Sequence, residues 1–105
     1  MAEKTFAAVL ADRDRIMARI TTGHGGTVEH YSLQFECRLG DSQEWTAIRR
    51  YDSSHGVVHV HVFRADGSER RVVDRAGVPF KEGLRLAWVE LSENWQRYRR
   101  TYEEG

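Results

Sequence analysis

Hydrophobic and polar residues alternate strictly in the middle of the chain. From Tyr31 to Leu39 every second residue is apolar, and the residues between them are polar or charged. A period of two places successive side chains on opposite faces of a strand, so this pattern predicts a strand with one buried and one solvated face. Three further segments follow, separated by turn sequences rich in glycine, aspartate and serine. The four predicted strands are Thr27–Leu39, Glu44–Tyr51, Val57–Arg64 and Ser68–Asp74.

The second of these strands is less regular than the others. Trp45 and Tyr51 fall on one face and Ile48 on the other, which indicates either a β-bulge or burial on both sides. The segment after it predicts a tight turn, because Asp52 can accept backbone amides and Gly56 permits a positive φ.

Apolar residues recur at three- and four-residue steps near both ends of the chain. This spacing predicts an N-terminal helix over Glu3–Ile20 and a longer C-terminal helix over Phe80–Tyr102. The first stripe consists of Phe6, Val9, Leu10, Met17 and Ile20. The second consists of Leu84, Trp88, Leu91, Trp95, Tyr98 and Tyr102.

The order of elements predicts a single α+β domain over residues 1–105. It consists of an N-terminal helix, a four-stranded antiparallel β-meander and a long C-terminal helix, with both helices on one face of the sheet. The predicted core contains Leu33, Phe35, Val58, Val60, Trp88, Leu91 and Trp95.

Composition narrows the classes of function. The chain has 16 Lys plus Arg and 16 Asp plus Glu, which argues against a strongly basic nucleic-acid clamp. Cys37 is the only cysteine, so an internal disulfide and a thiolate metal cluster are excluded. The N-terminal segment carries charge throughout and no apolar run approaches membrane-spanning length, so we expect a soluble, cytoplasmic protein without membrane contact.

Three of the five histidines lie between the second and third predicted strands or within the third. His59 and His61 are two residues apart, so both point to the same face, and His55 precedes them in the turn. The face would be left open by the helices, and it would also carry His30, Gln34, Glu36 and Arg38. Three interpretations stay open: a solvated strand, an acid–base pair, or a zinc or nickel site formed by His55, His59 and His61 with a carboxylate such as Glu36 or Glu69.

Arg49, Arg50 and Tyr51 precede the turn at the end of the second strand. A guanidinium suits a phosphate, and a tyrosine can orient the phosphate or stack on a base. Ordinary solvation of a strand end is the alternative interpretation.

Two groups of residues carry a resemblance to known proteins. Arg50-Tyr51-Asp52, His55-Gly56 and His59 form one group, and Asn94-Trp95 with Tyr98-Arg99 form the other. Together they resemble a family of small uncharacterised prokaryotic proteins over roughly residues 28–102. The aspartate–turn–histidine pattern is also similar to that of TumE-type toxins from toxin–antitoxin operons. The resemblance implies functional positions at Tyr51, Asp52, His55, Gly56 and His59, and an antitoxin as a protein partner.

These observations predict a metal-independent RNA-cleaving or RNA-binding site on the open sheet face. His59 would act as base or acid with His55 or His61 as its counterpart, arginine would stabilise the phosphate, and no cofactor would be needed. The predicted catalytic residues are His55, His59, His61, Arg50, Tyr51 and Asp52, and the predicted substrate-binding residues are Arg49, Arg38, Glu36 and His30.

Two other functions compete with this prediction. The first is an interaction module without chemistry, in which an edge strand or a surface anchor such as Trp45 contacts a protein partner or a second copy of the chain. The second is a metal-binding protein that uses the three histidines.

Overall fold

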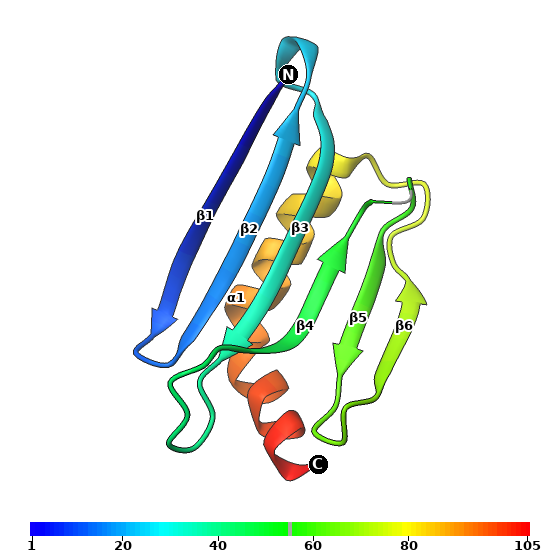
Figure 1. The fold of residues 1–105 in the computed structure, drawn as a ribbon. Helices are drawn as coiled ribbons and strands as arrows, with labels where there is room; N and C mark the ends of the chain where they lie inside the picture. The colour runs from blue at the N-terminus through cyan, green and yellow to red at the C-terminus, as the bar shows by residue number, and fades with distance from the viewer. Residues whose placement is uncertain (55) are drawn as a thin grey trace.

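The computed structural model describes residues 1–54 and 56–105. Six antiparallel strands form one sheet, and one long helix crosses one of its faces (Figure 1). The strands are paired in chain order, so that β1 and β6 are the two edges. The elements are β1 (Ala2–Ala11), β2 (Asp14–Thr22), a short 3₁₀ turn (His24–Gly26), β3 (Val28–Cys37), β4 (Thr46–Asp52), β5 (His59–Phe63), β6 (Glu69–Val73) and α1 (Phe80–Glu104).

The predicted N-terminal helix is wrong, because residues 2–22 form the β-hairpin of β1 and β2. Phe6 lies opposite Ala18 and Ala8 opposite Ile16, and these side chains face the helix. Val9 and Met17, which the helical stripe had placed with them, point to the other face, and Val9 is 78% exposed. The α+β class holds, but the sheet has six strands and a single helix covers it.

The remaining predicted elements are present with small shifts at their ends. The irregularity in the second predicted strand is a change of register between β3 and β4: Phe35 pairs with Arg49, and Glu36 pairs with Ala47. Ile48 is the extra residue of this bulge and is buried. The bulge is therefore the physical reason why the apolar pattern of β4 changes face.

The core lies between the sheet and α1, and the helix packs mainly across β3 and β4. Leu33, Phe35 and Leu91 are fully buried, as predicted, and Val58 and Val60 are nearly so. Trp88 and Trp95 are only partly buried. They flank the core, where Trp88 contacts Phe6 and Trp95 contacts Phe35 at ring-centre distances of 6.2 and 6.1 Å.

One face of the sheet is consequently free of the helix and faces the viewer in Figure 1. We call it the open face, and we call the other one the helix face. Among the described residues, no helix combines the length and the hydrophobicity needed to cross a membrane.

Candidate functional site on the open face

Strand pairing brings four of the predicted site residues together on the open face. In the ladder between β4 and β5, Arg50 lies opposite His61 and Asp52 lies opposite His59. Directly opposed residues share a face and have Cβ atoms about 5 Å apart. Two cross-strand pairs therefore form a patch of two imidazoles, one guanidinium and one carboxylate. His55 lies outside the described residues.

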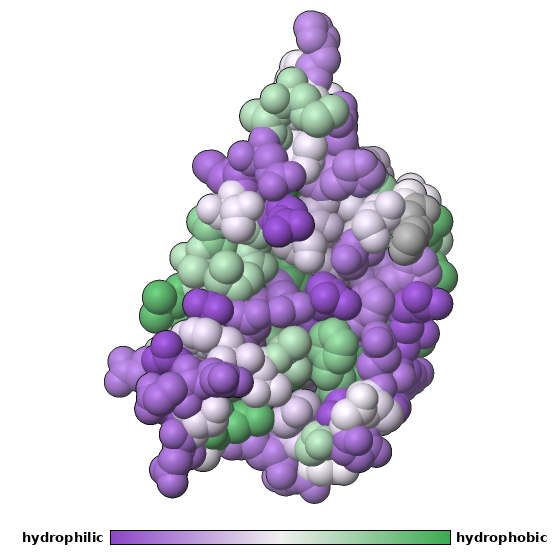
Figure 2. All heavy atoms as spheres, in the orientation of Figure 1, coloured by the Kyte–Doolittle hydropathy of each residue, from purple (hydrophilic) through white to green (hydrophobic). Residues whose placement is uncertain are grey.

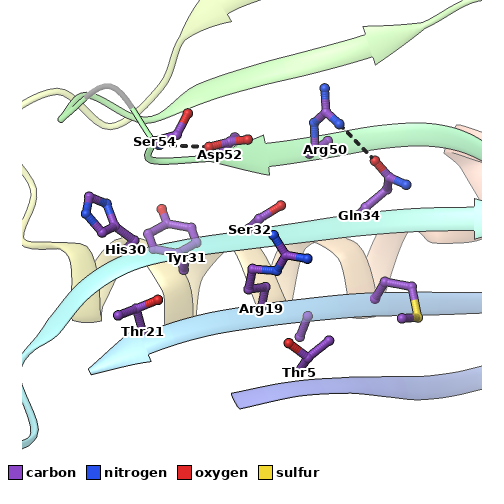
Figure 3. Close-up of a pocket in the computed structure, with 12 residues that line it drawn as sticks. Thr5, Arg19, Thr21, His30, Tyr31, Ser32, Gln34, Arg50, Asp52 and Ser54 are labelled. Atoms are coloured by element: carbon purple, nitrogen blue, oxygen red, sulfur yellow. Dashed lines mark hydrogen bonds between the residues drawn. The ribbon is translucent and has the colours of Figure 1, made fainter. Parts of the chain in front are cut away.

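A hollow of about 480 Å³ adjoins this patch on the side of β1 to β3 (Figure 3). Arg50 and Asp52 belong both to its wall and to the patch. His30, a predicted substrate-binding residue, lines the same hollow from β3, at the end where Asp52 and Ser54 lie. Polar side chains from three further strands complete the lining: Thr5, Arg19, Thr21, Ser32 and Gln34.

Arg50 is the cation shared by the hollow and the histidine patch. Its Nη1 donates to Oε1 of Gln34 at 3.3 Å, and its guanidinium carbon lies 5.4 Å from the ring centre of Phe63. Its Nε is buried without a hydrogen-bond partner among the described residues, and no carboxylate of these residues lies within salt-bridge distance. A buried N–H donor without a partner has a free-energy cost, which an anionic ligand would remove.

Glu69 orients one of the two histidines. Nδ1 of His61 lies 2.6 Å from Oε2 of Glu69, and the rings of His61 and Phe63 stack with an interplanar angle of 15°. This hydrogen bond lowers the pKa of Glu69 below its ordinary value, so the carboxylate is ionised at neutral pH. An ionised carboxylate can only accept, so Nδ1 of His61 donates to Glu69, and Nε2 has no hydrogen-bond partner among the described residues.

Asp52 has a structural task besides its place in the patch. Its Oδ1 accepts a hydrogen bond from the backbone amide of Ser54 at 2.7 Å, which is the turn-capping role expected of it. Ser53, the next residue, is buried and bonds to the backbone of Tyr31 on β3. Gly56 has a φ of +80°, as expected for this turn. The start of the turn is thus fixed against the neighbouring strand, and this holds Asp52 in place.

Glu36 and Arg38 lie on the same face at the other end of β3, away from the histidines. Glu36 accepts hydrogen bonds from Arg15 at 2.8 Å and from Gln34 at 2.6 Å, so its carboxylate is already occupied. Arg38 lies over the ring of Trp45 at 4.4 Å, and Arg15 lies at 4.0 Å from the same ring. The open face therefore continues as a polar surface with one aromatic ring beside two arginines, and Figure 2 shows hydrophilic side chains across most of it.

Tyr51 and Arg49 do not belong to this site, which corrects the grouping predicted from the sequence. They alternate with Arg50 and point to the helix face, where Nε of Arg49 donates to the Tyr51 hydroxyl at 3.0 Å. Arg49 and Tyr98 also bond to Oε1 of Glu90, at 3.3 and 2.9 Å. Burial raises the pKa of Tyr51, so its hydroxyl stays protonated at neutral pH.

The residues of α1 that carry part of the resemblance also have structural roles on the helix side of the sheet. Nδ2 of Asn94 donates to the Glu90 carbonyl, Tyr98 bonds to the Glu90 side chain, and Arg99 binds the buried carboxylate of Asp14 at 2.7 and 2.8 Å. Trp95 packs on Phe35. Trp95 and Arg99 attach the helix to the sheet, whereas Asn94 and Tyr98 bond to Glu90 within α1.

The sequence prediction missed the contribution of β1 and β2 to the site. Thr5, Arg19 and Thr21 line the hollow only because residues 2–22 form a hairpin. The available signal was the period-two alternation of Ile16, Ala18 and Ile20, with Arg19 between the last two and Thr21 after them.

The metal alternative depends on His55 and so on a residue outside the described part of the chain. Within residues 1–54 and 56–105, no three side chains of histidine, cysteine, aspartate or glutamate are grouped so that they could hold a metal ion. Cys37 is buried in the core, where burial raises the pKa of its thiol.

Comparison with known proteins identifies a family but no activity. The sequence model of a domain of unknown function, DUF7718, matches residues 1–105, and the chain belongs to this family. No curated protein and no solved structure was found to match the chain. The similarity to TumE-type toxins stays a prediction from the sequence.

Proposed function

We propose that the open face binds single-stranded RNA and cleaves it without a metal ion. The observation that carries this proposal is the position of Arg50. It is a partly buried cation with an unpartnered N–H among the described residues, and it lies between a hollow of nucleotide size and two histidines. Small-molecule sites in proteins typically have volumes of about 300–1,000 Å³.

RNA cleavage needs a base that takes the proton of the 2′-hydroxyl, an acid that protonates the leaving oxygen, and a cation that stabilises the phosphate charge. His61 has Nε2 free and accepts the proton of a ribose 2′-hydroxyl, whose oxygen attacks the neighbouring phosphorus. The bond from phosphorus to the 5′ oxygen of the next nucleotide breaks, and protonated His59 gives its proton to that oxygen. The products are a 2′,3′-cyclic phosphate and a 5′-hydroxyl, and no oxidant or cofactor is consumed. Arg50 stabilises the charge on the phosphorus oxygens during the step.

Binding relies on local charge because the net charge of the chain is zero. Arg19 and Arg50 line the hollow, and Arg38 lies beside Trp45 further along the same face, where Arg15 is paired with Glu36. Arginine beside exposed π-surfaces is typical of single-strand binding, where bases stack and phosphates pair with guanidinium groups. We expect an affinity that falls steeply with salt, because the contacts replace counter-ions.

A cleavage assay with labelled single-stranded RNA in EDTA tests the proposal. We expect His59→Ala and His61→Ala to lower the rate by about 10²–10⁴-fold. His24→Ala is the matched control, because His24 is exposed in the 3₁₀ turn between β2 and β3. RNA that carries a 2′-deoxy sugar at the cleaved position should bind without being cut. Equal cleavage by all variants, or no cleavage and no binding by the wild type, would overturn the proposal.

If the protein acts as a toxin, its expression should also have an effect on growth that can be tested in cells. Expression of the wild type should arrest growth and degrade cellular RNA, whereas expression of His59→Ala should do neither. Equal growth with intact RNA in both strains would remove the toxin interpretation, and with it the need for an antitoxin partner.

The exposed edge of β1 favours a second function, in which two copies of the chain pair through this strand. β1 has ten residues and β2 on one side only, and only Glu3 and Lys4 carry charge. Natural proteins usually protect such an edge with charges or a short strand, as on β6, whose five residues include Glu69, Arg70 and Arg71.

A second copy fits this edge for two reasons. Two-fold antiparallel pairing of β1 with itself keeps Phe6 and its neighbours on the helix face of both copies. Each partner would then extend over the apolar groove of about 700 Å³ that Phe6, Ile20, Leu84 and Trp88 form beside the edge.

Light scattering of Ala7→Pro and Ala8→Pro tests this pairing. Successive amides of a strand point to opposite edges, so one of the two variants loses only an outward amide. We expect a dimeric wild type and one variant that is folded but monomeric. A monomeric wild type, or two folded dimeric variants, would contradict the pairing.

A further inference from the structure

A second groove, of about 390 Å³, lies on the helix face between the C-terminal half of α1 and the ends of β4 and β5. Figure 1 shows the last turns of α1 approaching the end of β5. The groove is separate from the hollow on the open face, and the two share no lining residue. Its apolar and aromatic surface comes from Ile48, Val62, Tyr98 and Tyr102, and Phe63, whose ring stacks on His61, also lines it.

Three arginines line this groove, and no aspartate or glutamate of the described residues does so. Arg49 is occupied, because it bonds to Tyr51 and Glu90. Among the described residues, the guanidinium of Arg97 donates only to the side-chain oxygen of Asn94, at 3.3 Å, and that of Arg64 only to the hydroxyl of Ser68, at 3.4 Å. Two exposed arginines whose guanidinium groups have no carboxylate partner in the described chain therefore line one concave surface.

The arginines and the tyrosines of this groove together suit one class of ligand. Guanidinium groups bind phosphate in a bidentate manner, and a tyrosine ring offers a flat surface on which a base can stack. The guanidinium carbon of Arg97 lies 5.2 Å from the ring centre of Tyr98, so the charged and the aromatic elements are adjacent. The ring of Tyr98 is already contacted by the guanidinium of Arg49 at 4.3 Å, so Tyr102 is the ring left for a base. We propose that this groove binds a nucleoside monophosphate, with the phosphate at Arg64 and Arg97 and the base against Tyr102.

The site is independent of the proposed chemistry on the open face. Neither His59 nor His61 lines the groove, and the three residues assigned to the ligand lie outside the histidine patch. Phe63 is the lining residue that stacks on His61, and the proposed ligand does not depend on it. The groove binds its ligand whether or not RNA is cleaved, so His59→Ala and His61→Ala should leave its affinity unchanged.

Calorimetric titration with adenosine 5′-monophosphate tests the proposal. We expect Arg64→Ala and Arg97→Ala each to weaken binding by at least about tenfold, since a charge-assisted hydrogen bond contributes about 1.5–3 kcal/mol. Arg100→Ala is the matched control, because Arg100 is exposed on the same helix three residues further on and does not line the groove. Circular dichroism checks that all variants are folded.

Two comparison ligands make the result decisive. Adenosine alone should bind much more weakly because it lacks the charge, and inorganic phosphate should do so because it lacks the base. No binding of adenosine 5′-monophosphate to the wild type would overturn the proposal. Equal loss in Arg97→Ala and Arg100→Ala would place the binding elsewhere, and equal affinity for inorganic phosphate would reduce the groove to a simple anion site, so either outcome would overturn it too.

Discussion

Arg49 and Arg50 are neighbours in the sequence, yet they belong to two surfaces with different properties. On the helix face, Arg49 is held by Tyr51 and Glu90, and Arg75 binds the second oxygen of Glu90 at 2.6 Å. On the open face, Arg50 has only a long bond to Gln34, and its Nε has no partner among the described residues. The comparison separates charges that stabilise the fold from charges that are available to a ligand.

The largest expected effect comes from removing a buried charge on the helix face. Asp14 is 3% exposed, binds Arg99 through both oxygens and accepts the Cys37 thiol at 3.1 Å. Loss of one partner from a buried ion pair typically costs about 3–5 kcal/mol. We expect Asp14→Asn to lower the free energy of unfolding by about 3 kcal/mol in urea titrations. Asp12→Asn, in the exposed turn two residues earlier, should change it by less than about 0.5 kcal/mol, and equal effects would contradict the assignment.

The two adjacent arginines give the most direct test of the comparison. Arg49→Gln breaks bonds to a charged partner on the helix face, so we expect a loss of about 2 kcal/mol in unfolding free energy. Arg50→Gln should leave stability nearly unchanged and weaken RNA binding. Urea denaturation and fluorescence anisotropy measure the two effects. If the variants exchanged roles, with Arg50→Gln the less stable protein, the division between the two faces would be wrong.

Strands β3 and β5 could be predicted because their alternation has strong contrast, and β4 and β6 because turn sequences bound them. In β3, tyrosine, leucine and phenylalanine alternate with histidine, glutamine and glutamate, which fits a period of two and no helical period. The hairpin of β1 and β2 lacked this contrast. Phe6 and Leu10 are four residues apart, a spacing that fits both a helix and a strand, and the alanines between and after them are neutral to both patterns.

The site could be predicted in part for a similar reason. The spacing of His59 and His61 placed both on one face, and the structure pairs them with Asp52 and Arg50. Tyr51 could not join that group, because consecutive residues of a strand point to opposite faces. The contribution of β2 to the hollow depended on a strand that was predicted as a helix, and the partner of His61, Glu69, depended on the register between β5 and β6.

Glu90 allows a pH-dependent test of the helix face. Burial acts to raise the pKa of its carboxyl, but hydrogen bonds from Arg75 and Tyr98 outweigh burial and lower the pKa below its ordinary value of 4.5. A carboxyl with a lowered pKa in the folded state stabilises the protein above its unfolded-state pKa, and this contribution is lost as the pH falls through the folded-state pKa. We expect Glu90→Gln to be less stable than the wild type by about 1–2 kcal/mol at pH 7.

The difference between Glu90→Gln and the wild type should shrink as the pH falls below 4.5. Thermal melts between pH 7 and pH 3 measure it. Glu93→Gln is the control, because Glu93 is exposed on the same helix. A difference that stayed constant over this range would show that the charge of Glu90 does not contribute.

The smallest expected effect concerns the contact between Gly83 of α1 and the hydroxyl oxygen of Tyr31 on β3. A Cβ atom at Gly83 would lie 2.9 Å from the hydroxyl oxygen of Tyr31, whose ring is buried and cannot move aside. Alanine is normally better than glycine in a helix by about 1 kcal/mol. We nevertheless expect Gly83→Ala to destabilise the protein by about 1 kcal/mol, because the contact is shorter than packed atoms tolerate.

A double-mutant cycle with Tyr31→Phe decides whether this oxygen is the cause. The hydroxyl of Tyr31 has no hydrogen-bond partner among the described residues, so its removal should change stability little. It also leaves the Cβ atom introduced by Gly83→Ala facing the ring carbon at 3.8 Å, an ordinary contact. In the Tyr31→Phe background, Gly83→Ala should therefore become stabilising by up to about 1 kcal/mol, in line with helix propensity. Additive effects of the two substitutions would show that the hydroxyl oxygen of Tyr31 is not the cause of the destabilisation by Gly83→Ala.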